Sequence, residues 1–210
     1  MSMTYKKLIP LFVTILIIAL LALSPFLPGP SFLSKPAKFF YSVAQFLSLI
    51  GFLVLPVGLW LTIREIRRKG ANEHYSFRMM PVFLVAIPIT LISCFYLDNT
   101  MRNFSRSIAI KQANKIIVAI ESYRIEHNEY PKNLINLQPK HLKAIPNSFI
   151  IGIADYQYES FNSTYSLSFR QMVLVGLNYE VVTYNPIHEV QSDGETFETG
   201  FKHWSYYISD

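Results

Sequence analysis

An acidic stretch near the C-terminus, residues 189–198, carries the side chains best suited to bind an ion. It contains Asp193, Glu195 and Glu198, with Gly194 among them. Carboxylate oxygens around a glycine turn are typical calcium ligands, so these three acids are candidate calcium ligands. Ser-Asp-Gly is also ordinary turn chemistry, and the stretch lacks the aspartate-rich spacing of a calcium loop. Both interpretations, a calcium site and a simple turn, stay open.

Polar residues elsewhere form no motif that indicates a reaction. The chain has no Gly-x-Ser-x-Gly elbow, phosphate-binding loop or dinucleotide fingerprint. No two histidines share a helix face with a carboxylate, and we expect surface positions for His74, His127, His141, His188 and His203. Asp98, Asn99 and Arg102 lie at the mouth of an apolar segment, where a membrane enzyme would place its catalytic groups. We predict no catalytic site and keep a membrane enzyme as the least favoured hypothesis.

Composition and charge indicate a chain partly dissolved in lipid. The mean hydropathy is +0.26, which is high for a soluble globule. Residues 1–97 carry nine Lys/Arg and two Asp/Glu (+7), whereas residues 98–210 carry ten and twelve (−2), which gives the net charge of +5. The basic charge therefore belongs to the apolar half. Because a nucleic-acid surface needs basic residues clustered on a folded domain, we expect no nucleic-acid partner.

Three apolar stretches predict transmembrane helices over about 8–27, 39–63 and 79–97. Each reaches the roughly 20 residues that cross a hydrocarbon core, and none contains a charged residue or histidine. Intramembrane charge marks transport and proton relay, so its absence argues against a channel, pump or transporter. A cleaved signal peptide is the alternative for the first stretch, but its apolar core is long for a signal. Gly51 and Gly58 are candidate points of close helix contact.

The loops between these stretches predict the direction of insertion. The connection 64–78 carries five Lys/Arg against Glu65 and Glu73, which places it in the cytoplasm. The N-terminus, with Lys6 and Lys7, then lies on the same side. The connection 28–38 and everything after Asp98 lie outside. We therefore predict a membrane protein with a cytoplasmic N-terminus and a water-facing domain at residues 98–210 outside the cytoplasm.

The pattern after the third stretch predicts an α+β domain. A helix is expected over about 102–127, because Ala109, Ala113, Ile116 and Ile120 recur on one face. Asn128 suits a left-handed helix end. Alternating residues then predict strands, and a long helix followed by an antiparallel meander gives a small sheet packed on the helix. The strand candidates are Tyr156–Tyr158, Tyr165–Phe169, Tyr179–Tyr184 and Trp204–Ile208.

Residues 116–146 carry a pattern with a family resemblance. The helix ending Ala119-Ile120-Glu121-Ser122-Tyr123-Arg124 is followed by His127-Asn128-Glu129-Tyr130-Pro131, and then by Ile145-Pro146. This segment resembles the major pseudopilins of type II secretion and related type IV pilin-like proteins. The resemblance implies a pilin-like fold and raises the expectation of calcium in the C-terminal loop. The chain departs from the family in lacking a leader-peptide junction before span 79–97 and the glutamate inside it, so polymerisation by the family route is not implied.

Together with the resemblance, these observations favour a non-enzymatic protein of the bacterial cell envelope, located in the inner (cytoplasmic) membrane. We expect the bilayer to anchor it and the outer domain to bind an envelope protein, as an accessory of a secretion or pilus-type assembly. The alternative is a sensory or ligand-binding module, with the basic connection 64–78 as an inner contact. A shared fold does not imply a shared task, so the choice depends on the sites the fold builds.

Overall fold

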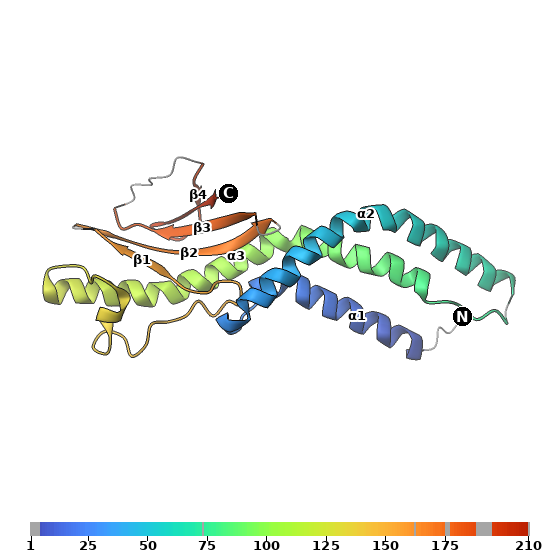
Figure 1. The fold of residues 1–210 in the computed structure, drawn as a ribbon, viewed down its shortest axis with the longest axis horizontal. Helices are drawn as coiled ribbons and strands as arrows, with labels where there is room; N and C mark the ends of the chain where they lie inside the picture. Colours follow the sequence, from blue (N-terminus) through green and yellow to red (C-terminus); the bar gives the residue numbers. More distant parts are fainter. Residues whose placement is uncertain (1–4, 73, 162, 175–176, 188–194, 210) are drawn as a thin grey trace. The chain divides into compact units, whose positions relative to one another are not determined.

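The computed structural model describes residues 5–72, 74–161, 163–174, 177–187 and 195–209. The chain forms two compact units, one of Met1–Ser24 with Phe39–Asn99 and one of Pro25–Lys38 with Thr100–Asp210. The long helices are α1 (Tyr5–Leu23), α2 (Ser34–Ala71) and α3 (Met80–His127), and both α2 and α3 contribute residues to each unit. Figure 1 shows these elements in chain order.

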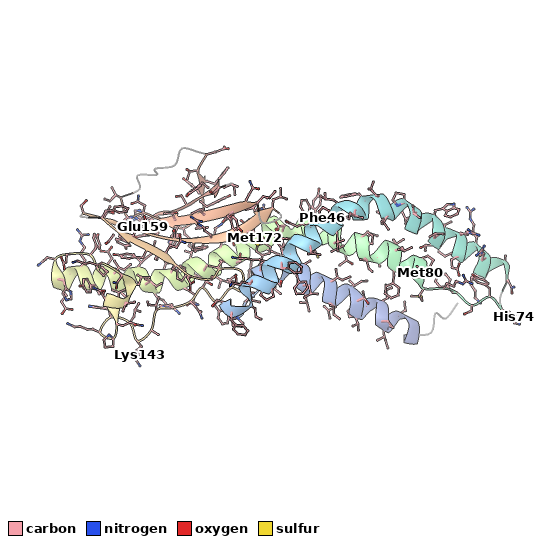
Figure 2. All side chains as sticks on the ribbon, viewed as in Figure 1. Phe46, His74, Met80, Lys143, Glu159 and Met172 are labelled. Carbon is pink, nitrogen blue, oxygen red and sulfur yellow. The ribbon has the colours of Figure 1, made fainter. Side chains whose placement is uncertain are left out.

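The first unit consists of apolar helices. Each of the three long helices in the described part of the chain is long and apolar enough to cross a membrane, as the sequence predicts. Large apolar side chains such as Phe12, Phe46 and Leu53 are 58–78% exposed, and Figure 2 marks Phe46 on α2. A water-soluble fold would bury such side chains, whereas lipid is a suitable solvent for them. Each helix also contains a proline, which transmembrane helices tolerate.

Two glycines allow α2 and α3 to approach each other closely, as the sequence suggested. A Cβ on Gly58 would lie 2.7 Å from the backbone oxygen of Leu84, and one on Gly51 would lie 3.2 Å from Pro88 Cβ. The contact at Gly58 is with backbone, which cannot rotate away as a side chain can. Small residues at helix interfaces are a common device in membranes because they let backbones meet.

The predicted span over 79–97 and the predicted helix over about 102–127 belong to one continuous helix, α3. Asp98 and Asn99 lie within it. The hydroxyl of Tyr41 on α2 donates a hydrogen bond to Asp98 Oδ1 at 2.5 Å, and Asp98 is buried. The Asp98 carboxylate thus has a hydrogen-bond partner on α2 while Asp98 itself stays helical.

The second unit packs the C-terminal half of α3 against an antiparallel sheet (Figure 1). The strands in the described residues are β1 (Gln157–Ser160), β2 (Tyr165–Leu174), β3 (Asn178–Tyr184), β4 (Phe197–Glu198) and β5 (Trp204–Ser209). They form one sheet of five strands in the order β1-β2-β3-β5-β4. The predicted long helix and small antiparallel sheet are confirmed. β4 was not predicted, because two residues are too short to show an alternating pattern.

The core of this unit lies between the helix and the sheet. The predicted helix face is fully buried: Ala109, Ala113, Ile116 and Ile120. Alternate residues of β2, namely Tyr165, Leu167 and Phe169, meet it from the sheet. α3 ends as predicted, with Asn128 in the left-handed region (φ 55°) and its N–H donating to Arg124 O at 2.8 Å.

The segment Pro25–Lys38 folds with this second unit. Backbone hydrogen bonds join Gly29 N to Phe149 O, Ile151 N to Leu27 O and Gly152 N to Pro25 O at 2.8–3.1 Å. A Cβ on Gly152 would lie 2.5 Å from Pro25 O, so only glycine allows this approach. The connection between the first two apolar helices is therefore paired with the C-terminal fold.

Candidate functional site

The C-terminal end of α3 and the segment after it hold the candidate site. The helix carries Glu126 and His127 in its last turn, and Asn128 turns the chain back. The short helix η3 (Leu134–Leu137) follows, capped by the Asn133 side chain, which accepts a hydrogen bond from Asn136 N. Leu137 is fully buried and anchors this segment in the core.

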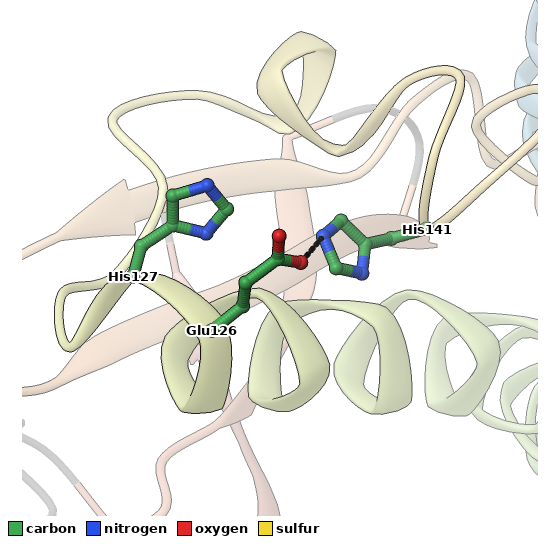
Figure 3. Close-up of side chains that lie close together, drawn as sticks. All are labelled: Glu126, His127 and His141. Atoms are coloured by element: carbon green, nitrogen blue, oxygen red, sulfur yellow. Dashed lines mark ion pairs between the residues drawn. The ribbon is translucent and has the colours of Figure 1, made fainter.

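His141 reaches Glu126 because the segment after η3 is fixed to Leu137. The N–H groups of His141 and Leu142 both donate to Leu137 O, at 2.9 and 3.0 Å. The His141 side chain is only 10% exposed, and its Nε2 lies 3.5 Å from Glu126 Oε2. Figure 3 shows the Glu126 carboxylate between the His127 and His141 rings. One ligand atom from each of the three residues lies within 4.8 Å of the others.

Neighbouring side chains hold these groups in place. His127 Nδ1 lies 3.0 Å from Tyr123 O, and its ring stacks on the Tyr123 ring with centroids 4.0 Å apart. The Tyr123 ring also meets the His141 ring edge-on at 5.7 Å. Lys140 forms an ion pair with Glu126 Oε1. The Lys140 ammonium holds the pKa of Glu126 below its usual range, so Glu126 is an anion at neutral pH.

The predicted calcium ligands are not brought to this place. Asp193 lies outside the described residues. Glu195 precedes β4, Glu198 lies in β4, and both are exposed. Calcium at this loop therefore stays a prediction.

The polar residues predicted as a possible enzyme site lie in different surroundings. Asp98 is buried and accepts the Tyr41 hydrogen bond, and the Tyr41 hydroxyl in turn accepts one from Gln45 Nε2 at 2.7 Å. Asn99, the next residue on α3, is exposed. Asp98 thus takes part in a hydrogen-bonded link between α2 and α3, which is a structural role.

A second polar cluster lies inside the C-terminal unit, between α3 and the sheet. Arg106 Nε and Nη2 donate to the two carboxylate oxygens of Glu180 at 2.5 and 2.7 Å. Gln171 Nε2 donates to Glu180 Oε1 at 2.8 Å, and Ser105 Oγ donates to Gln171 Oε1 at 2.6 Å. The Tyr206 ring lies 3.9 Å from Arg106 Cζ. All four polar residues are buried and bonded to one another, so this network joins the helix to the sheet.

Sequence patterns did not reveal the cluster at Glu126. The sequence was searched for histidines and acids that share a helix face. Adjacent residues such as Glu126 and His127 do not share one, so the search did not find them. His141 comes from a separate segment, and the expectation of a surface position is wrong for it. The only usable pattern was two histidines flanking the Tyr130-Pro131 turn.

Comparison with protein-family models, curated proteins and solved structures found no match to this chain.

Proposed function

We propose that this protein is a non-enzymatic, membrane-anchored protein of the bacterial cell envelope. Its apolar helices hold it in the inner membrane, and its C-terminal unit binds an envelope protein on the outer side. The resemblance of residues 116–146 to pseudopilins suggests an accessory role in a secretion or pilus-type assembly. The observation that carries the proposed membrane arrangement is the pairing of Pro25–Lys38 with the rest of the C-terminal unit.

That pairing supports the predicted orientation. Residues 25–38 connect the first two apolar helices, and residues 100–210 follow the third. Polar chain on opposite sides of a bilayer cannot pair, so the hydrogen bonds from Gly29 and Gly152 support an arrangement with both regions on one side. The basic connection 64–78 then lies on the other side, which the positive-inside bias assigns to the cytoplasm.

Two exposed apolar residues on α3 are the candidate contact points for a partner. Val118 and Ile125 are 66% and 82% exposed, and their seven-residue spacing places them on one face of α3. The opposite face of the same helix is buried against the sheet. Val118 and Ile125 are therefore the exposed apolar residues of α3 that we propose for contact with the partner.

Site-directed crosslinking in membranes tests this proposal. A photoreactive residue at Ile125 should capture an envelope protein, whereas one at exposed Lys143 (Figure 2), on a loop of the same unit, should not. Ile125→Glu should abolish the association, and Lys143→Glu should leave it unchanged. If neither position captures an envelope protein, or if both variants bind alike, the proposed role is wrong.

A ligand-binding or sensory function is the second candidate. The specific observation in its favour is the grouping of Glu126, His127 and His141, which offers a small ligand or ion three converging polar groups.

A further inference from the structure

His141 carries an unsatisfied group. Its side chain is nine-tenths buried, and Nε2 is shielded from solvent and has no hydrogen-bond partner among the described residues. Native folds rarely leave a buried polar atom without one, so each case requires an explanation. Here Nε2 is directed at Glu126 Oε2, 3.5 Å away, which is too long for a hydrogen bond. The gap between these atoms is suited to a third group that binds both.

The His127 ring is also held in an orientation suited to binding such a group. Its Nδ1 lies within hydrogen-bond distance of Tyr123 O, a carbonyl that can only accept, so Nδ1 carries the proton. The neutral ring then has its lone pair on Nε2. A ring N–H bonded to a backbone carbonyl is the usual support of a metal-binding histidine, because it fixes both the tautomer and the ring orientation. Stacking on Tyr123 restrains the ring further.

Glu126 completes the set with a negative charge. Lys140 occupies Oε1, which leaves Oε2 as the oxygen that faces His141. All three residues lie well beyond the predicted third span, which ends near Leu97, so water-borne ions can reach them.

We propose that Glu126, His127 and His141 bind a divalent transition metal ion, with Zn²⁺ as the best fit. Two imidazole nitrogens and one carboxylate oxygen are a typical zinc donor set, with one position left for water or another ligand. Ca²⁺ and Mg²⁺ prefer oxygen donors and are not expected here. This site differs in residues and in ion class from the acidic stretch 189–198, and it does not depend on the proposed partner binding.

The ion would tie two segments together. Glu126 and His127 belong to α3, whereas His141 belongs to the segment after η3. A shared ligand set would hold this segment on the helix end, and its amide hydrogens at residues 140–142 should exchange more slowly when metal is present.

The test is a zinc titration of the full chain, purified in detergent and stripped with a chelator. Competition with a chromophoric chelator should show one Zn²⁺ bound per chain, and X-ray absorption should show a first shell of nitrogen and oxygen with imidazole scattering. His127→Gln and Glu126→Gln should each weaken binding by at least about tenfold, since even outer-shell changes reach that size. Both residues are exposed, so these variants should fold normally.

Matched controls separate the site from nonspecific binding. His74→Gln and Glu129→Gln change exposed residues of the same types outside the cluster, and both should bind zinc as the original chain does. His141→Gln should lose binding and also the slowed exchange at residues 140–142. No zinc binding by the original chain would overturn the proposal, as would equal binding by His127→Gln and His74→Gln, or Ca²⁺ binding at these three residues in place of Zn²⁺.

Discussion

The buried ion pair between Arg106 and Glu180 offers the sharpest test of how α3 is held on the sheet. Glu180→Gln keeps the shape of the side chain and removes its charge. Arg106 would then stay buried, with its side chain 7% exposed and no counter-ion at position 180. Breaking one partner of such a pair typically costs about 3–5 kcal/mol, because the remaining charge is left in a low-dielectric interior.

Two contacts reduce that loss. The Tyr206 ring lies 3.9 Å from Arg106 Cζ and continues to stabilise the cation. The amide oxygen that the substitution introduces still accepts one hydrogen bond from Arg106, so we expect the lower end of the range, about 3 kcal/mol. At a slope of ~2 kcal/mol per molar urea, this shifts the unfolding midpoint by ~1.5 M.

Urea unfolding in detergent, followed by tryptophan fluorescence, measures this change. The chain has two tryptophans, Trp60 and Trp204, so a Trp60→Phe background leaves buried Trp204 as the reporter of the C-terminal unit. Glu159→Gln, an exposed change on β1 of the same sheet (Figure 2), should stay within about 0.5 kcal/mol.

The double variant Arg106→Met, Glu180→Leu separates charge burial from packing. It should be more stable than Glu180→Gln alone, because an apolar pair leaves no uncompensated charge in the interior. If Glu180→Gln proves as stable as Glu159→Gln, the buried pair does not hold α3 on the sheet, and the expected cost of the unpaired charge is refuted.

Three further predictions concern two glycines in close contacts and the tyrosine Tyr158. Gly58→Val should disrupt the packing of α2 on α3 and lower the melting temperature in detergent, whereas Gly70→Val, with open space around it, should have only a small effect; equal effects would contradict the contact. Gly152→Ala should break the hydrogen bond to Pro25 and speed amide exchange at position 152, and unchanged exchange would refute this. Burial raises the pKa of Tyr158 to about 12. The fold therefore favours the neutral phenol: this stability is fully present below pH ~10 and is lost as the pH rises toward ~12. Circular dichroism should show alkaline unfolding in that window, and the final rise in tyrosinate absorbance should occur over the same pH range. If all tyrosines ionise while the circular dichroism spectrum stays that of the folded protein, this prediction is refuted.

The sequence predicted those features that leave a local pattern. Uninterrupted apolar runs identified the helices of the first unit, and alternation at Tyr165, Leu167 and Phe169 identified β2. Asn128 marked the end of α3 because few other residues tolerate a left-handed conformation.

The features that the sequence did not predict depend on contacts between distant residues. The pairing of Gly29 with Phe149 joins segments that have no shared periodicity, and the hydrogen bond from Tyr41 to Asp98 joins residues of two different helices. The cluster of Glu126, His127 and His141 forms only because a turn and η3 return the chain to the helix end. The sequence around each of these residues contains no pattern that indicates which distant residue it contacts.

Thiol labelling of intact spheroplasts tests the membrane arrangement most directly. In a Cys94→Ala background, single cysteines replace exposed Lys35, Lys143 or Arg67. A membrane-impermeant maleimide should label Lys35→Cys and Lys143→Cys in intact spheroplasts, and Arg67→Cys only after permeabilisation. Labelling of Arg67→Cys in intact spheroplasts, or protection of either of the other two, would contradict the proposed arrangement.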